Sequence, residues 1–228
     1  MAKVLVSNVT FILGPSKGID RLKVKTQVDY KFDYGSNKDV VRCTIVCPEV
    51  RDKDKVITTI KAALGAEYGI YAVGDIKIKD PALFLGYSDT TYIIGFYGCK
   101  LCVEVQINNR NLLYAKMKPS SFKQNILSEP RCKNYSDLRS KLNGLRGGFG
   151  HLFYELHRDL KAKNEDHPDL KGIELISTRY YKACKACEKE DTFSEIELNS
   201  FRERYDEHFT EDHSKAWSEL LDDGQLFL

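Results

Sequence analysis

Long hydrophobic runs, a strong net charge and a low-complexity tract are all missing from this 228-residue sequence. No stretch of about 18 consecutive apolar residues occurs, so no transmembrane helix is expected. The 35 Lys and Arg almost balance the 33 Asp and Glu, which excludes a polybasic tail but leaves room for a local basic surface. Because 42% of the residues are hydrophobic, wholesale disorder is excluded as well.

The cysteines give no sign of a disulfide framework. There are seven, an odd number that cannot pair completely within one chain. The first eight residues hold only a short apolar run, which indicates a strand rather than a signal peptide. We therefore expect mostly reduced thiols and a cytoplasmic location.

The first half of the chain has the pattern of a sheet. Apolar residues alternate with polar ones over 22–32, which predicts a half-buried strand. A helix is predicted around Val56, Ile60 and Leu64, where apolar residues share one helical face before Gly65. Further strands are predicted at 40–47, 70–78, 82–87, 92–97, 101–107 and 112–117.

The second half changes to helical spacing. Apolar residues recur every three or four positions over 138–145, 152–160 and 173–180, and less regularly over 193–221. Strands followed by helices indicate an α+β fold, with a mostly antiparallel or mixed sheet. No linker composition interrupts the chain. We therefore expect one domain over 1–228, with a sheet-rich part at 1–118 and a helical part at 119–228.

Several motifs are present only in part. Two CxxC pairs, Cys99 with Cys102 and Cys184 with Cys187, offer four thiols, but 82 positions separate them and the second pair falls on a predicted helix. The glycine-rich segment 144–150 lacks the Lys and Ser/Thr of a P-loop, so a loop between helices is expected. His208 and His213 lie in an acidic stretch that we interpret as solvated surface rather than a metal site.

Four short motifs in order resemble the ribosome-inactivating proteins, which are rRNA N-glycosylases. Asp-Thr-Thr-Tyr-Ile-Ile-Gly-Phe at 89–96 resembles a strand of that family, and Asn-Tyr-Ser-Asp-Leu at 134–138 resembles a helix followed by Gly and Arg. Ser-Thr-Arg-Tyr at 177–180 resembles the end of the catalytic helix. Trp217, the only tryptophan, begins a segment similar to the end of the catalytic domain.

The resemblance implies a hydrolase that removes an adenine from large-subunit ribosomal RNA, a defence toxin that inhibits translation without cofactor or metal. Its implied partners are the ribosome with its RNA, and adenine as the released base. The base would be extruded and held between two tyrosine rings, while a cation stabilises the charge that develops on it. Tyr92 and Tyr135 would hold the base between their rings, and backbone groups around Ile93 would contact the base edge. Arg179 would supply the cation, with Glu174 as the nearest acid. Trp217 would form the floor of the pocket, and Arg146 would face the RNA backbone.

The sequence departs from that family at the catalytic acid. The family has Glu three residues before the arginine, where this chain has Ile176. Glu174 lies five positions before Arg179, so on a regular helix it points about 140° away. Glu155, Glu211 and Asp212 are other acids that nothing in the sequence places nearby.

Three alternatives stay open. The first is a catalytically impaired homologue that binds RNA or adenine nucleotides. The second is a non-catalytic protein-interaction module with its acidic C-terminal helices as the contact surface. The third alternative is a zinc-stabilised domain built on the CxxC pairs.

Overall fold

The protein is described by a computed structural model that covers residues 9–14, 18–29, 31–33, 37–47, 52–99, 101–122, 124, 144–186 and 193–223. It divides into two compact units. The sheet unit comprises Met1–Ile78 and Asp89–Arg110, and the helical unit comprises Lys79–Ser88 and Asn111–Leu228. The strands lie in the first half of the chain and most of the helices follow them, so the fold is α+β as the sequence predicts. Whether the two units behave as the single expected domain stays a prediction.

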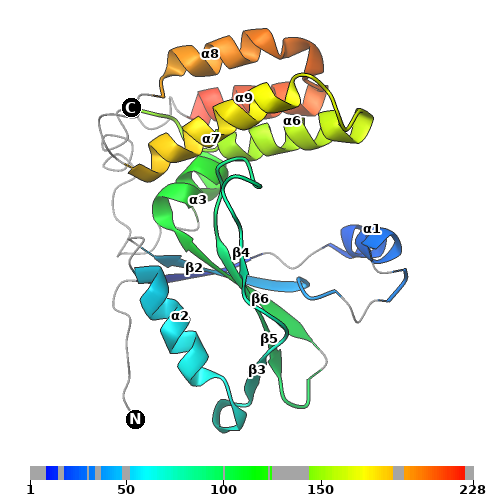
Figure 1. Cartoon of the computed structure of the whole chain (residues 1–228), viewed down its shortest axis with the longest axis vertical. Helices are drawn as coiled ribbons and strands as arrows, with labels where there is room; N and C mark the ends of the chain where they lie inside the picture. Colours follow the sequence, from blue (N-terminus) through cyan, green and yellow to red (C-terminus); the bar gives the residue numbers. More distant parts are fainter. Residues whose placement is uncertain are drawn as a thin grey trace. The chain divides into compact units, whose positions relative to one another are not determined.

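The sheet unit holds a mixed six-stranded sheet in the order β1-β2-β6-β5-β3, with β4 paired to β5 (Figure 1). β2 and β6 are parallel, and the other pairs are antiparallel. The strands are β1 (Thr10–Leu13), β2 (Val41–Cys47), β3 (Ile70–Ala72), β4 (Lys77–Ile78), β5 (Thr90–Phe96) and β6 (Cys102–Asn109).

One face of this sheet is covered by a helix. The helix α2 (Asp52–Ala63) places Val56 in an apolar cluster with Ile45, Tyr92 and Ile107. A short 3₁₀ helix, η2 (Ala66–Tyr68), follows it, and α1 (Ile19–Asp29) lies between β1 and β2 in the chain. The strand at 40–47 and the helix around Val56 are therefore confirmed.

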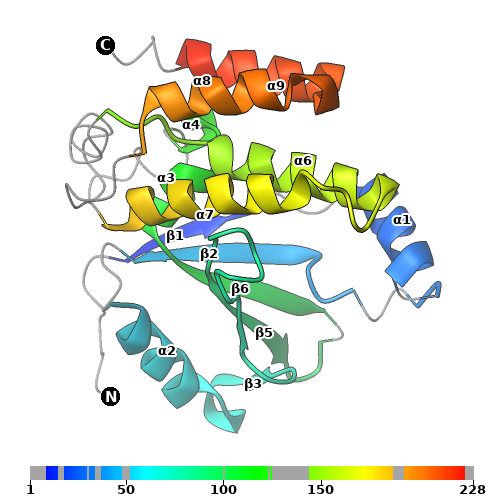
Figure 2. The same ribbon diagram turned by 45° about the horizontal axis from the view of Figure 1, so that its top comes forward.

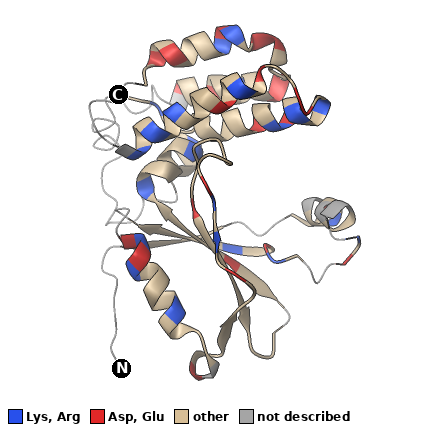
Figure 3. Ribbon diagram, in the orientation of Figure 1, with Lys and Arg blue, Asp and Glu red and all other residues tan. Residues whose placement is uncertain are grey.

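The helical unit contains the other helices. They are α3 (Arg110–Lys116, which begins at the last residue of the sheet unit), α4 (Pro119–Phe122), α6 (Phe149–Lys163), α7 (Leu170–Ala186), α8 (Glu195–Arg204), η5 (Asp206–His208) and α9 (Glu211–Asp223). In Figure 2, α6 and α7 run side by side. Basic and acidic residues are mixed along these helices (Figure 3).

Aromatic rings fill the core of the helical unit. Phe149 lies 4.8 Å from Trp217 and Phe153 lies 4.7 Å from Phe201, measured between ring centroids. Tyr180 packs edge-on against Phe153, and its hydroxyl donates to the backbone oxygen of Arg146 at 2.7 Å. Such ring pairs add about 0.5–1.5 kcal/mol each beyond their buried area. The helical spacing over 152–160 and 173–180 is confirmed.

Two predicted strands are helices. The segment 22–32 lies mostly in α1, because the polar residues between its alternating apolar ones, such as Lys and Gln, are good helix formers. Val24 is 62% exposed, so the alternating residues do not share one buried face. The hydroxyl of Thr26 instead donates to the Leu22 backbone oxygen one turn earlier, at 2.7 Å. Thr26 also accepts from the Asn37 amide.

The segment 112–117 lies mostly in α3, where four consecutive residues from Leu112 to Ala115 are buried. A short apolar run that is buried on all sides has no periodicity that would distinguish a helix from a strand. Residues 82–87 form turns rather than a strand, and 70–78 is interrupted at Gly74, which has a φ of 82°. The predicted helix over 138–145 lies almost entirely outside the described residues.

Among the residues that the structure describes, none of the helices combines the length and the apolar character needed to cross a membrane.

Candidate functional site

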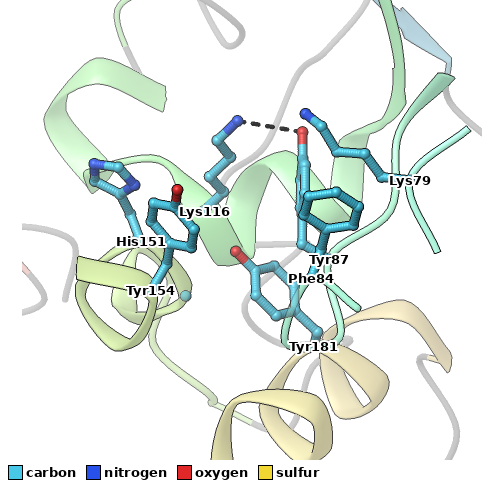
Figure 4. A pocket seen from close by; sticks show the side chains of 8 residues that line it. Lys79, Phe84, Tyr87, Lys116, His151, Tyr154 and Tyr181 are labelled. Atoms are coloured by element: carbon cyan, nitrogen blue, oxygen red, sulfur yellow. Dashed lines mark hydrogen bonds between the residues drawn. The ribbon is translucent and has the colours of Figure 1, made fainter. Parts of the chain in front are cut away.

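A cavity of about 230 Å³ opens in the helical unit (Figure 4). Four segments meet around it: the turn before β5, the end of α3, the first two turns of α6, and α7. The residues that line this aromatic pocket are Lys79, Phe84, Tyr87, Lys116, Gly150, His151, Tyr154 and Tyr181.

The turn that carries Tyr87 is fixed against α7. Leu85 and Gly86 both have left-handed backbones, with φ of 54° and 85°, and this conformation is unfavourable for leucine. The Ser177 hydroxyl donates to the Leu85 backbone oxygen at 2.8 Å. A Cβ on Gly86 would lie 2.7 Å from the Cα of Thr178, so only glycine allows the turn to approach this closely.

Two buried tyrosines form the floor of the pocket. The ring centroids of Tyr87 and Tyr181 are 5.6 Å apart. Burial, and secondarily the nearby Cys184 thiol, raises the pKa of Tyr181, which keeps its hydroxyl protonated. A Cβ on Gly150 would lie 2.3 Å from Cζ of Tyr181. The Tyr181 ring therefore rests directly on the backbone of α6.

Two lysines reach the same tyrosine from different segments. Lys116 Nζ donates to the Tyr87 hydroxyl at 3.3 Å and lies 4.5 Å from its ring centroid (Figure 4). Lys79 Nζ lies 5.4 Å from the Tyr87 centroid and 5.9 Å from that of Phe84. Cations at these distances are attracted by the ring faces. The pocket therefore concentrates positive charge beside aromatic surface.

The first turn of α6 adds backbone donors. Its N-cap is Gly148, with a φ of 91°, and no side chain makes a capping hydrogen bond there. The Gly148 amide donates to the Tyr114 backbone oxygen at 2.9 Å, and a Cβ on Gly147 would lie 2.6 Å from that oxygen. The glycines thus pack the segment onto α3 and direct the start of α6, with Gly150 and His151, into the pocket. Helix N-termini of this kind favour anions.

The walls of the pocket expose aromatic faces. Phe84 is 39% exposed and Tyr154 is 41% exposed. The Tyr154 ring stacks on the His151 ring, with centroids 6.2 Å apart and planes 16° apart. The cavity is smaller than the roughly 300–1,000 Å³ that encloses a drug-sized ligand. It suits one planar ring system, with an anionic remainder of the ligand at the lysines and the helix N-terminus.

The residues predicted from the family resemblance in the helical unit have other partners. Arg179 pairs with Glu197 at 2.6 Å, and Arg146 pairs with Glu195 at 2.7 Å. Glu174 hydrogen-bonds His157 at 2.9 Å. Trp217 is buried against Phe149 and Phe201. None of these residues lines the aromatic pocket. Within the described part of the unit, no hydrogen bond or ion pair joins Arg179 to Glu174.

Two of the other predicted residues belong to the sheet unit. Tyr92 and Ile93 lie on β5 of the sheet unit, where Tyr92 is only 2% exposed and burial raises its pKa. Tyr135 lies outside the described residues, as does Cys187. Whether any of the seven predicted residues contacts a ligand stays a prediction.

Comparison with known proteins does not support the family that the sequence motifs suggest. No protein-family profile matches it. The chain is 30% identical over 172 residues to the (p)ppApp synthetase toxin Tas1 of Pseudomonas aeruginosa, covering 75% of this chain but only 35% of the relative. The chain thus spans about a third of that protein. A crystal structure of the Type VI effector Tas1 with its immunity protein superposes with a TM-score of 0.58 at 26% identity, covering 77% of this chain and 81% of the other. The small alarmone synthetase 1 of Bacillus subtilis matches more weakly, with a TM-score of 0.41 at 15% identity, covering 87% and 80%.

The likeness to Tas1 overturns the resemblance to ribosome-inactivating proteins. The expected adenine-releasing hydrolase and its partners, the ribosome and adenine, are wrong. The four motifs that suggested them are short and built from common residues. Two are explained by packing: Tyr92 belongs to the apolar cluster of the sheet, and Trp217 to the aromatic core of the helical unit.

Proposed function

We propose that this chain is a nucleotide pyrophosphokinase that makes (p)ppApp. The observation that carries the proposal is the aromatic pocket, which combines ring faces, two lysines and a helix N-terminus within one cavity. The sequence identity to a (p)ppApp synthetase toxin supports the choice of adenine nucleotides. Of the alternatives left open by the sequence, adenine-nucleotide binding fits best.

The chemistry follows from the product. The abbreviation (p)ppApp places two or three phosphates on one side of the adenosine and a diphosphate on the other. A ribose hydroxyl of the acceptor nucleotide therefore attacks the β-phosphorus of ATP, the bond between the α- and β-phosphates breaks, and AMP leaves as the hydroxyl proton is lost. Such transfers depend on positioning and charge stabilisation more than on covalent groups of the protein.

Each part of the pocket has a task in this proposal. A purine stacks on the exposed faces of Phe84 and Tyr154, where stacking contributes about 1–3 kcal/mol per base. Lys79 and Lys116 neutralise phosphate oxygens, and the backbone amides in the first turn of α6 donate hydrogen bonds to the same anionic group. Tyr87 and Tyr181 form a fixed floor, because one is tied to Lys116 and the other rests on Gly150.

The test compares binding and turnover in matched variants. Purified chain is titrated with ADP and with ATP by calorimetry, and then incubated with both nucleotides and Mg²⁺ while the nucleotides are separated by anion exchange. We expect Tyr154→Ala and Lys116→Met to lose binding and turnover together. Lys161→Met, at an exposed position farther along α6, serves as the matched control. Wild-type affinity in both pocket variants would remove the pocket from the proposal.

A toxin role is part of the proposal, because the relative is named a toxin and the Tas1 structure holds an immunity protein. The cytoplasm, where ATP is abundant, is the proposed place of action. Expression of the chain in bacteria is expected to stop growth and lower ATP. Normal growth with a full ATP pool would contradict this role.

A further inference from the structure

We infer that the helical unit carries a transition-metal site, which the synthetase activity does not require and which takes Zn²⁺. Its ligands are His167 and Asp169, from the turn between α6 and α7, and His208 from η5. One ligand atom of each lies within 4.8 Å of the others. These three residues are called the His-Asp-His cluster below.

The distances in the cluster are close to those of a bound ion. His208 Nε2 lies 2.9 Å from Oδ2 of Asp169, and His167 Nδ1 lies 3.9 Å from the same oxygen. Zinc bonds of about 2.0–2.1 Å at tetrahedral angles separate neighbouring ligand atoms by about 3.3 Å. Small side-chain rotations therefore bring the three atoms onto one ion.

The hydrogen bonding of His167 suits a metal. Its Nδ1 accepts a hydrogen bond from the Asp169 backbone amide at 3.3 Å, so this nitrogen presents its lone pair toward Asp169. A metal needs that lone pair, and it would take the place of the amide as its partner. The two imidazole rings are perpendicular, with centroids 5.0 Å apart, so both edges can face one point.

The backbone holds the ligands in place before any ion binds. In the turn, the His167 amide donates to the Asn164 oxygen at 3.2 Å, and the Asp166 amide to the Asn164 side chain at 3.1 Å. On the other side, the His208 amide donates to the Tyr205 oxygen at 3.0 Å. All three ligand residues are partly buried, unlike an ordinary solvated acidic surface.

The surroundings favour a cation. The Glu207 carboxylate lies 3.7 Å from His208 Nε2 and adds a second negative charge beside Asp169. The Tyr205 hydroxyl is buried and has no hydrogen-bond partner among the described residues. An ion at Asp169 would offset the negative charge of these two carboxylates.

The donor set selects the kind of metal. Two imidazoles and one carboxylate suit Zn²⁺ and its transition-metal neighbours, whereas Mg²⁺ and Ca²⁺ prefer oxygen ligands alone. Three protein ligands leave a fourth position for water. Because the cluster joins the α6–α7 turn to η5, a bound ion would clip these two segments together and stabilise the helical unit.

The test uses the chain freed of its purification tag and stripped with a chelator. ZnCl₂ is titrated by calorimetry, Co²⁺ is titrated while the visible absorption of its tetrahedral complex is followed, and thermal unfolding is measured with and without Zn²⁺. We expect one ion per chain, a visible Co²⁺ spectrum and a higher Tm with Zn²⁺.

The variants separate a metal site from a purely structural contact. His167→Ala removes one ligand but keeps the hydrogen bond between His208 and Asp169, so the chain still folds. We expect it to bind Zn²⁺ at least tenfold more weakly and to lose the Tm gain. His151→Ala, which removes an exposed histidine outside the cluster, leaves both unchanged. No saturable binding by the wild type, or equal affinity in His167→Ala, would overturn the inference.

Discussion

Lys116→Met is the sharpest perturbation of the aromatic pocket, because it removes a charge and keeps most of the side-chain stem. In the structure, Lys116 Nζ is 3.3 Å from the Tyr87 hydroxyl and 4.5 Å from the Tyr87 ring. A hydrogen bond from a charged donor to a phosphate oxygen contributes about 1.5–3 kcal/mol. At about 1.4 kcal/mol per factor of ten, the variant should bind ADP and ATP roughly 10 to 150 times more weakly.

The assay is calorimetric titration of ADP and ATP at one fixed ionic strength, since salt screens these contacts. Thermal unfolding of each variant shows that the pocket is intact. Lys161→Met, which removes an exposed lysine of the same helical unit, should bind within twofold of the wild type. If Lys116→Met also binds within twofold, or if both variants lose affinity equally, the charge of Lys116 has no part in nucleotide binding and the reasoning fails.

Three further variants probe stacking, packing and pH dependence. Tyr154→Ala should raise the Kd for ADP about 5- to 150-fold, from lost stacking of about 1–3 kcal/mol, with little change in Tm because the ring is half-exposed; an unchanged Kd by calorimetry would place the base elsewhere. Gly150→Ala should cost about 1–3 kcal/mol through overpacking against Tyr181, which exceeds the roughly 1 kcal/mol that alanine contributes to helix stability. Urea unfolding should therefore show a net loss of stability, and a net gain would mean that Tyr181 moves freely. The hydrogen bond from Lys118 lowers the pKa of Glu219, so its stabilisation is present at neutral pH and is lost as the pH falls through the lowered value. Lys118→Met should therefore lose less stability than the wild type between neutral and acidic pH, and a parallel decline of both proteins would contradict this.

The fold was predictable where local pattern and tertiary burial agree. The strand β2 and the helices α6 and α7 follow the spacing of their apolar residues closely. The helix α1 was not predictable, because its alternating apolar residues are not all buried and the Thr26 hydroxyl donates to the Leu22 backbone oxygen one turn earlier. The α3 segment is buried all round, and such a run carries no period that separates helix from strand.

The pocket was harder to predict because its members come from four distant segments, and no short motif joins them. One signal was available in the glycine-rich segment 144–150, where Gly148 and Gly150 precede and open a helix with an apolar face. The absence of a P-loop lysine after the glycines excluded one kind of phosphate site, but Lys79 and Lys116, from elsewhere in the unit, line the same pocket as Gly150. The pair His208 and His213 in an acidic stretch likewise predicts solvated surface, because the sequence does not show that His208 faces Asp169.

The most direct measurement follows the fate of ATP labelled at the α-phosphate in one reaction and at the γ-phosphate in another, each with unlabelled ADP as acceptor. The account predicts that the γ label appears in a pyrophosphorylated adenosine nucleotide, while the α label appears in an equal amount of AMP. Transfer of the γ label alone, with the α label left in ADP, would indicate a simple phosphoryl transfer. That result, or release of labelled phosphate without any new nucleotide, would contradict the account.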